Sequence, residues 1–410
     1  MRLNTIPASN VSEGVPIRRF ISGTFMIAGT TIGAGMLGIP LETAKAGFFP
    51  SVIMTILVWF FMLCTGLLFL EVSLWMPEGT NVLSMANRFL GGTGRTLAGG
   101  VFVLLYYCLM VAYFAAGAPL LSGFFSGGLG VEMQGWLSYL IFGVIFWLIV
   151  GFGAKWIDRT SIILTAAMVV SYLALIGTGS SEIQPKFLYA TDWSSMFYAI
   201  PILFSAFGYH NVIPSLNTHL NRDKKALRLS IITGTLVALF VYLIWQWIFI
   251  GSIPQEIIAE AQSLGLPATQ ALQSVTGKPL IYMLGKYFAF FAIVSSLLGV
   301  AFSMVDFLAD GLKLSKRGNK QMFLSFLTFS PPFIFAGINP LVFDKALGIA
   351  GGFGEAVLNG LFPVGLVWMG RYALKLKTES SILGKKWVLA LLFAISIAVM
   401  VIEAIVLIKQ

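Results

Sequence analysis

Apolar stretches of about 20 residues recur along the whole 410-residue chain, and they constrain its fold more than any other feature. A helix that rises about 1.5 Å per residue needs this length to cross a hydrocarbon layer of roughly 30 Å. Only 10% of the residues are charged, whereas a soluble domain carries about 25%. Long uninterrupted apolar runs, such as residues 162–176, are typical of helices and not of barrel strands. The sequence therefore predicts an all-α integral membrane protein.

The apolar stretches predict eleven transmembrane helices. The expected spans are residues 19–46, 51–76, 96–125, 135–151, 160–178, 194–216, 228–252, 279–311, 321–338, 345–372 and 387–408. Positively charged loops are retained in the cytoplasm, and 20 of the 26 Lys and Arg residues are cytoplasmic if the amino terminus is inside. We therefore expect a cytoplasmic amino-terminal segment, residues 1–18, and a periplasmic carboxyl terminus. The net charge of +9 reflects this topology, so no nucleic-acid partner is expected.

Cysteine and histidine are too sparse to indicate a metal centre or a catalytic site. Cys64 and Cys108 both fall inside expected spans, and neither has a metal-ligand spacing. The two histidines, His210 and His219, belong to no HExxH motif and have no cysteine nearby. No serine has a GxSxG context. We therefore expect no metal, no cofactor and no enzymatic activity. A membrane-embedded enzyme is a remote alternative.

The first expected span is interrupted by the stretch GTTIGAGMLGIP, residues 29–40. Its four glycines let the backbone leave helical geometry, and Pro40 suits the first turn of a helix that starts again. Close helix packing is the alternative, because Gly29 and Gly33 have GxxxG spacing, but Gly33 and Gly35 cannot share a face. Non-helical backbone at membrane depth is tolerated only beside protein or a water-filled cavity. The stretch therefore predicts a broken helix that lines a cavity.

A second interruption lies in the sixth expected span, in the stretch FSAFGYHNVIPSL, residues 204–216. Span one starts inside and span six starts outside, so residues 19–178 and 194–372 would form two five-helix halves of opposite orientation. Each half opens with a broken helix. Paired breaks in inverted halves indicate a transporter whose site lies at the middle of the membrane. Residues 387–408 are then an additional helix outside the 5+5 inverted repeat.

The ends of broken helices can recognise a zwitterion without charged side chains. Free N–H groups attract a carboxylate, and unpaired carbonyls at the opposite half-helix end attract an ammonium group. The second break would also supply an aromatic wall. The residues expected to bind an amino acid substrate are Thr31, Ile32, Gly33, Ala34, Gly35 and Met36 at the first break, and Phe204, Ser205, Phe207, Gly208, His210 and Asn211 at the second.

Four stretches resemble a known family. They are AGTTIGAGMLGIP (28–40), FLEVSLWMPEGTNVLSMANRFLG (69–91), FGYHNVIPSL (207–216) and LLGVAFSMVDFLADGLK (297–313). They are similar to bacterial hydroxy and aromatic amino acid permeases, in particular the tyrosine and tryptophan permeases. The resemblance implies the LeuT-type fold of the amino acid/polyamine/organocation superfamily. It also implies a multi-pass protein of the bacterial inner membrane that imports an aromatic amino acid by proton symport, with tyrosine favoured and tryptophan next.

Three ionisable side chains are candidates for binding the coupling proton. His210 lies at the second break and can change its charge near neutral pH, but it could also be a neutral partner of freed backbone groups. Glu355 is the deepest carboxylate and shares a helix face with Asn359, which leaves a buried structural pair as the alternative. Asp306 lies near the inner end of its span, where it could gate the cytoplasmic exit. Glu71 is expected to be a solvated or ion-paired anchor.

Sodium coupling remains open from the sequence. Ser295 and Ser296 resemble the hydroxyl pair with which sodium symporters of the LeuT fold bind the ion, and the Ala28 and Thr31 carbonyls would complete such a site. Adjacent serines also commonly bond to carbonyls of their own helix. A sodium-coupled symporter or an exchanger of another neutral amino acid is therefore an alternative, and a channel is a remote one. We expect a monomer whose partners are its substrate and the lipid bilayer.

Overall fold

The computed structural model of the chain describes residues 16–33, 35–78, 80–129, 135–263, 272, 277–339, 341–377 and 382–409. In chain order, its helices are α1 (Ile17–Thr31), α2 (Gly35–Ala44), α3 (Phe48–Trp75), α4 (Val82–Leu129), α5 (Trp136–Gly151), α6 (Ala154–Gly179), η1 (Ser180–Glu182), α7 (Pro185–Leu188), η2 (Ser195–Ala199), α8 (Ile200–Ala206), η3 (His210–Val212), α9 (Ile213–His219), α10 (Lys224–Ser252), α11 (Gln255–Ser263), α13 (Pro279–Leu312), α14 (Gly318–Ile338), α15 (Phe343–Ile349), η4 (Ala350–Leu361), α16 (Phe362–Trp368), η5 (Met369–Ala373), η6 (Ile382–Gly384) and α17 (Lys386–Lys409). Here η4 and η5 are π-helical, and the other η elements are 3₁₀ turns.

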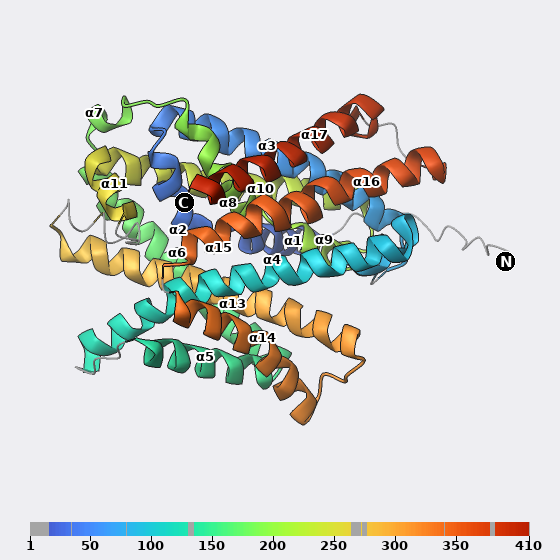
Figure 1. Cartoon of the computed structure of the whole chain (residues 1–410), viewed down its shortest axis with the longest axis horizontal. Coiled ribbons are helices and arrows are strands. Elements are labelled where there is room, and N and C mark those ends of the chain that lie inside the picture. The colour runs from blue at the N-terminus through green and yellow to red at the C-terminus, as the bar shows by residue number, and fades with distance from the viewer. Residues whose placement is uncertain are drawn as a thin grey trace.

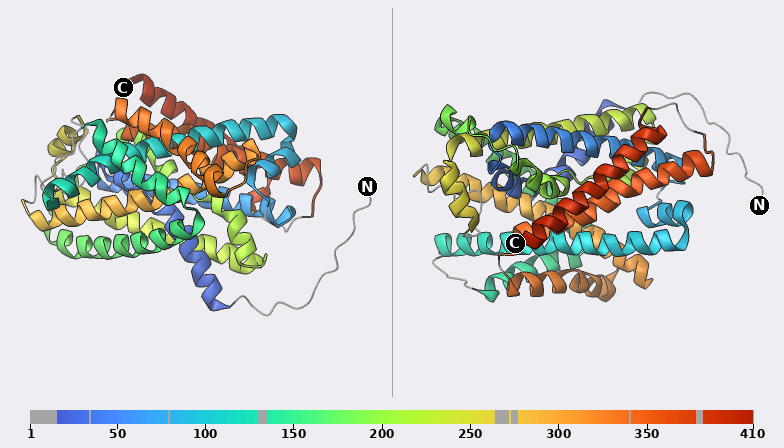
Figure 2. Two further views of the ribbon diagram at one scale, coloured as in Figure 1. Left: turned by 90° about the horizontal axis from the view of Figure 1, so that it is seen from below. Right: turned by 45° about the horizontal axis from the view of Figure 1, so that its top comes forward.

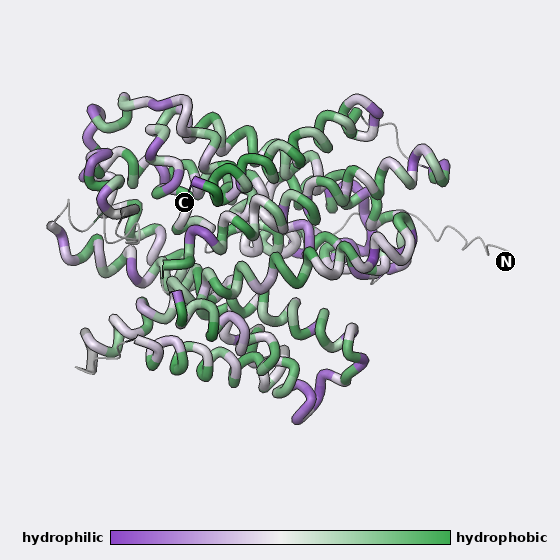
Figure 3. The backbone as a smooth tube through the Cα atoms, viewed as in Figure 1, coloured by the Kyte–Doolittle hydropathy of each residue, from purple (hydrophilic) through white to green (hydrophobic). Residues whose placement is uncertain are grey.

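The helices confirm an all-α membrane protein. In the described part of the chain, nine helical segments are long and apolar enough to cross a membrane, or ten if the bent pair of α1 and α2 is one span. The shorter helix α5 is also apolar. Figure 3 shows hydrophilic residues gathered at the two ends of the bundle and hydrophobic residues between them, as a bilayer requires. The expected amino-terminal segment falls mostly on residues 1–15, which lie outside the described residues.

The helices run roughly along one axis and enclose the two broken helices (Figures 1 and 2). Helices α5 and α14 pack together at one edge of the bundle, and α13 packs on α6 beside them. The half-helix α1 packs on α10, while α2 packs on α8 and α10. Helix α8 also packs on η4 and α15, and α9 packs on α3. Both interrupted helices therefore lie where neighbours on several sides can satisfy their freed backbone groups.

Pro40 does not start a helix as expected, because α2 already begins at Gly35 and carries Pro40 in its interior. A proline inside a helix leaves the carbonyl four residues earlier without its usual donor. That carbonyl belongs to Met36, and the indole Nε1 of the buried Trp245 donates to it at 3.1 Å. The side chain of α10 thus replaces the lost backbone hydrogen bond, which explains why α2 continues through the proline.

The expected span 96–125 begins earlier in the structure, as part of α4. Gly91 interrupts this helix with a φ of 72°, a left-handed conformation that glycine adopts without a steric penalty. The long segment 253–278 contains one short helix, α11, whose Ile258 is buried and which packs on α2. Residues 264–271 and 273–276 of this segment lie outside the described residues.

Candidate functional site

The first break separates α1 from α2 and confirms the predicted order of helix, break and helix. Helix α1 ends at Thr31, α2 begins at Gly35, and the two helices are bent by 55°. A Cβ atom at Gly35 would lie 2.7 Å from the Cα of Ala206, the last residue of α8. The two breaks therefore touch through their backbones. Among the described residues, no heavy atom of another element lies within 4 Å of a Cβ at Gly29, so Gly29 does not serve the close helix packing considered above.

The second break lies between α8 and α9, as predicted. Helix α8 ends at Ala206, and Phe207–Tyr209 precede the 3₁₀ turn η3. Pro214 falls in the first turn of α9, where its missing N–H costs little. The Tyr209 hydroxyl donates to the Met62 carbonyl of α3 at 3.1 Å. Packing and hydrogen bonds thus fix the second break to α3.

One side chain joins the two breaks. The hydroxyl of Tyr242, in α10, lies 2.6 Å from the Thr31 carbonyl oxygen and 2.8 Å from the Ala206 carbonyl oxygen. These carbonyls belong to the last residues of α1 and α8, where no helical donor remains. Tyr242 is fully buried. The sequence did not single out Tyr242, because a tyrosine in an apolar span carries no local signal of its long-range partner.

A cavity of about 1520 Å³ begins between the two breaks. It extends to one end of the bundle, which we call the open end, where Asn81, Lys313 and Lys316 line it. At the other end, which we call the closed end, α2 packs on α8 and α10. The predicted site residues that line the cavity are Thr31, Gly33, Gly35, Ser205, Gly208, His210, Asn211, Ser295, Ser296, Asp306 and Glu355.

Of the residues predicted to bind substrate, four do not line this cavity and one lies outside the described residues. Ile32, Met36, Phe204 and Phe207 are buried and do not line it, and Ala34 lies outside the described residues. The Phe204 ring packs on Phe61 of α3, and the Phe207 ring packs on Tyr242 of α10. These two phenylalanines therefore do not form the expected aromatic wall in this conformation, because their positions on and after α8 direct them towards α3 and α10.

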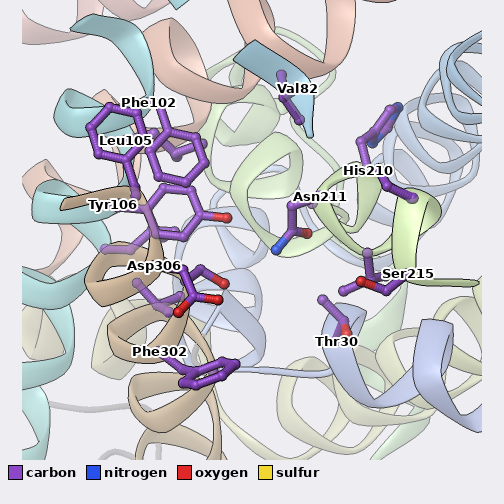
Figure 4. Close-up of a pocket in the computed structure, with 18 of the residues that line it drawn as sticks. Thr30, Val82, Phe102, Leu105, Tyr106, His210, Asn211, Ser215, Phe302 and Asp306 are labelled. Carbon is purple, nitrogen blue, oxygen red and sulfur yellow. The ribbon is translucent and has the colours of Figure 1, made fainter. Parts of the chain in front are cut away.

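Aromatic side chains of α4 and α13 line the cavity instead. The Phe102 ring stacks on Tyr106 with centroids 4.0 Å apart and on Phe307 with centroids 4.6 Å apart. Figure 4 shows the Tyr106 hydroxyl pointing towards Asn211 of the second break, with Phe302 at the edge of the same space. The sequence did not single out these residues. The helical spacing of Phe102, Tyr106 and Tyr113 on one span was the available signal, but such spacing is equally typical of core packing.

Glu355 connects the π-helical segment η4 to the second break. It is 5% exposed, lines the cavity and accepts a hydrogen bond from Asn359, which confirms the predicted pair. A Cβ at Gly208 would lie 2.8 Å from the Glu355 carboxyl carbon, so this carboxylate lies directly against the break. Within the described residues, no Lys or Arg forms an ion pair with Glu355. A π-helical turn at such a position is a common feature of functional sites.

His210 bonds to a side chain and not to the freed backbone groups. Its Nε2 lies 3.0 Å from the Thr65 hydroxyl oxygen of α3, and its Nδ1 is buried with no partner among the described residues. The ring is 1% exposed, although the residue belongs to the cavity lining. In Figure 4 His210 lies across the cavity from Tyr106 and Asp306. His210 is therefore a second link between the break and α3.

The groups suggested for sodium already have partners. The Ser295 hydroxyl donates to the Ala292 carbonyl of its own helix at 3.1 Å. The Ala28 carbonyl accepts from the Ile32 N–H at 2.8 Å, and the Thr31 carbonyl accepts from Tyr242. The hydroxyl of Ser296 faces Gly33 of the first break. In this conformation the Ser295 hydroxyl and the Ala28 carbonyl thus bond within their own helices, and the Thr31 carbonyl bonds to α10.

Two ion pairs lie at the open end. Lys316 bonds to Asp306 at 2.7 Å, and both side chains are substantially exposed. Arg371 donates to both carboxylate oxygens of Glu71, at 2.8 and 2.6 Å. The prediction that Glu71 is an ion-paired anchor is confirmed. Exposed pairs such as Asp306 and Lys316 contribute little stability, typically about 0–1 kcal/mol, so this one can separate easily.

A deep cavity between two broken helices, in a bundle of apolar spans, defines a membrane transporter. The model of the tryptophan/tyrosine permease family matches residues 17–403, and the chain belongs to this family. It is 33% identical to the tyrosine-specific transport system 1 of Haemophilus influenzae, over 87% of this chain and 90% of that protein. It is 31% identical to a tryptophan-specific transport protein of Pseudomonas aeruginosa, over 82% of this chain and 83% of that protein.

The low affinity tryptophan permease of Escherichia coli is 28% identical to the chain, over 80% of this chain and 82% of that protein. Membership of a permease family makes the chain a transporter and confirms that it is not an enzyme. The same membership confirms the family resemblance on which the sequence analysis relied.

Proposed function

We propose that the protein imports an aromatic amino acid, with tyrosine favoured and tryptophan next, by proton symport. The observation that carries this proposal is the cavity that begins at two touching helix breaks and is lined by stacked aromatic rings. The relatives named for tyrosine and tryptophan transport support the aromatic substrate. The identities to tyrosine and tryptophan transporters overlap, so the order of the two substrates rests on the sequence resemblance alone.

The breaks supply opposite partial charges for the zwitterion. The first N–H groups of α2, from Gly35 onwards, would receive the substrate carboxylate, because a helix amino terminus attracts anions. The carbonyls at the end of α8, near Ser205, together with Glu355, would receive the ammonium group. The Phe102, Tyr106 and Phe307 stack would then lie beside the aromatic side chain of the substrate. Aromatic pairs of this kind contribute about 0.5–1.5 kcal/mol beyond their buried area.

The proposed architecture is a LeuT-type fold of eleven helices, with residues 19–178 and 194–372 as inverted halves and 387–408 as an added helix. The lysine-rich turn at 313–320 lies at the open end, and positively charged loops are retained in the cytoplasm, so the open end would be cytoplasmic. The amino terminus would then be cytoplasmic and the carboxyl terminus periplasmic. In this orientation the cavity opens to the cytoplasm, so the structure would represent an inward-facing state. We propose a monomer in a bacterial inner membrane, since relatives of the chain come from bacteria.

Glu355 is our choice for the proton carrier. A buried carboxylate without a cationic partner is stabilised when it takes up a proton. Because Glu355 lies against Gly208, its charge and the shape of the second break depend on one another. The hydrogen bonds of Ser295, Ala28 and Thr31 leave a lone pair on each of these oxygens, so they do not decide between a proton and sodium. Sodium coupling and exchange of another neutral amino acid stay as alternatives.

The proposal can be tested in proteoliposomes with radiolabelled amino acids. We expect a proton gradient to drive saturable tyrosine uptake, which tryptophan inhibits more strongly than leucine, and a sodium gradient alone to drive none. Glu355→Gln should abolish accumulation against a gradient but keep counterflow exchange. Glu256→Gln, an exposed carboxylate of α11, is the matched control. Uptake driven by sodium alone would establish the sodium-coupled alternative, and a steady current without saturation would indicate a channel.

A further inference from the structure

Three carboxylates meet at the closed end of the bundle, where α2, α15 and α17 pack together. Glu42, Asp344 and Glu403 line a small cavity of about 20 Å³, together with Tyr198 and Ile202. Figure 1 shows α2, α15 and the carboxyl end of α17 in this half of the molecule, away from the end at which α4 begins. None of the three carboxylates lines the central cavity. This acidic cavity is therefore a separate feature.

Glu403 and the Oδ1 of Asp344 are buried without a hydrogen-bond partner in the described part of the chain, although Asp344 as a whole is half-buried. Glu403 is 1% exposed, and among the described residues it has neither a hydrogen bond nor an ion pair. A Cβ at Gly348 would lie 2.8 Å from its Oε1, so the Glu403 carboxylate lies against α15. The Oδ1 of Asp344 is also buried without a partner in the described structure, and it lies 3.9 Å from a Cβ at Gly38. Asp344 thus reaches α2.

Three lysines lie near the cluster, and one of them, Lys345, lines the same cavity. Lys45 pairs with Glu42 at 3.5 Å and is largely exposed. Lys409 donates to the Tyr198 hydroxyl at 2.9 Å and lies over its ring. Lys345 is exposed, and within the described residues none of these lysines forms an ion pair with Asp344 or Glu403. Lys345 acts on Glu403 and Lys45 on Asp344, but neither lysine lies within ion-pair distance of these carboxylates, so the negative charge of the cluster is offset only in part.

The size and chemistry of the acidic cavity favour one ligand. Buried carboxylates at close range cannot all remain charged, and sharing a proton removes the repulsion between them. A cavity of roughly this volume holds about one water molecule, which can bridge a shared proton. Within the described residues, no acidic or histidine cluster has an arrangement suited to a metal ion. A proton, with at most one water, is the ligand that fits.

We propose that Glu42, Asp344 and Glu403 form a proton-binding site, separate from the central cavity, whose bound proton keeps α2 packed against α15 and α17. Loss of that proton would place like charges on three helices at contact distance. The resulting repulsion would separate α2, one half of the first broken helix, from α15, which continues into η4 and Glu355. The site would therefore control opening of the closed end. This role rests on the proposed transport function, whereas proton binding itself does not.

The test measures access to the closed end as a function of pH. Ile202→Cys, in a variant whose Cys64 and Cys108 are replaced by serine, places a thiol on the acidic cavity. The probe is a membrane-impermeant methanethiosulfonate. At each pH, the rate at which the probe labels the introduced thiol is divided by its rate with a free thiol in solution. This ratio removes the effect of thiol ionisation on the rate. We expect relative labelling to rise about tenfold as the pH increases and carboxylate repulsion opens this end.

Asp344→Asn and Glu403→Gln imitate the protonated carboxyl groups. Each should abolish the rise and leave labelling slow at every pH, whereas Glu256→Gln should keep it. An unchanged rise in both variants would overturn the proposal, and so would a response to sodium instead of pH. In case a variant fails to fold, infrared spectroscopy of the native protein provides a second measurement. A protonated carboxyl band that persists in Glu355→Gln supports the site, and its complete loss in Glu355→Gln contradicts it.

Tyrosine counterflow in the same vesicles separates this proposal from the proposed function. Wild-type protein that exchanges no aromatic amino acid would contradict the function but leave the labelling result intact. Wild-type protein that exchanges tyrosine, with labelling independent of pH, would contradict the proton site alone.

Discussion

The two helix breaks of this protein are constructed differently. The first, between Thr31 and Gly35, contains Gly33 and no polar side chain, and the hydrogen bond and close contacts described for it come from neighbouring helices. The second, between Ala206 and Ile213, has large side chains that reach out to α3, through Tyr209 to a backbone carbonyl and through His210 to Thr65. The first break thus depends on the space that its surroundings leave, whereas the second is anchored by its own side chains.

This difference indicates how the two breaks could act together. A break without side-chain anchors can change its conformation at little cost, whereas an anchored one keeps its geometry relative to α3. The Gly35 contact with Ala206 and the Tyr242 hydroxyl couple the two breaks. We therefore expect the largest effects on transport from changes to this coupling, and smaller effects from changes to either break alone.

Gly35→Val should have the largest effect. Its Cβ would lie 2.7 Å from backbone of α8, which cannot move aside as a side chain can. We expect uptake to fall by about 100-fold, equivalent to roughly 3 kcal/mol of overpacking. Gly29→Ala is the matched control, because nothing lies within 4 Å of its added Cβ. Radiolabelled uptake, normalised to the amount of protein in the membrane, measures both. Near-normal uptake by the valine variant would show that the breaks need not touch.

Tyr242→Phe should have the next largest effect, because it removes the one hydroxyl shared by the ends of α1 and α8. Leaving a buried carbonyl without its donor costs about 1–3 kcal/mol, so we expect uptake to fall about tenfold. Phenylalanine keeps the ring contact with Phe207 and should preserve folding. Thermal unfolding that changes little, together with lower uptake, would identify Tyr242 as a positioning residue. Unchanged uptake would mean that the breaks do not depend on this link.

Gly33→Ala should have a smaller effect than Gly35→Val, although the two glycines are only two residues apart. Its Cβ would meet the Ser296 hydroxyl, a side-chain atom that can rotate away. We expect a loss of about threefold, and a non-additive rescue when Ser296→Ala removes that hydroxyl. A double-mutant cycle on initial uptake rates measures the coupling. If Ser296→Ala does not restore uptake, the added methyl group would instead disturb the backbone of the first break.

His210→Gln should have the smallest effect if His210 anchors the second break and does not carry the proton. Glutamine can still bond to the Thr65 hydroxyl. We expect a loss of about twofold, within the range of one net hydrogen bond, and an unchanged pH profile of uptake. Thr65→Ala should reproduce the loss without the histidine being altered. A profile that moves along the pH axis only in the histidine variant would instead make His210 a proton sensor.

Much of the fold was predictable because its signals are local. The hydrophobicity of each span predicts that the span lies in a bilayer. Glycine-rich or proline-containing interruptions predict where the backbone departs from the helix. The pair of Glu355 and Asn359 was also predictable, since residues one helical turn apart share a face.

Contacts between distant segments were not predictable in this way. The direction in which Phe204 and Phe207 point depends on the rotation of α8 and on the backbone after it, which the neighbours of α8 set. The partner of the Met36 carbonyl is Trp245, more than 200 residues later. No periodicity in the sequence relates these positions.

The sequence by itself determined that the chain consists of apolar membrane-spanning helices, where the two breaks lie and to which family the chain belongs, because each follows from residues that are adjacent or one helical turn apart. Only the tertiary structure decided that the two breaks touch, that one tyrosine joins them, and that α4 and α13 supply the aromatic lining. The physical reason is that helix packing fixes the rotation of each helix about its axis, and this rotation selects which side chains meet.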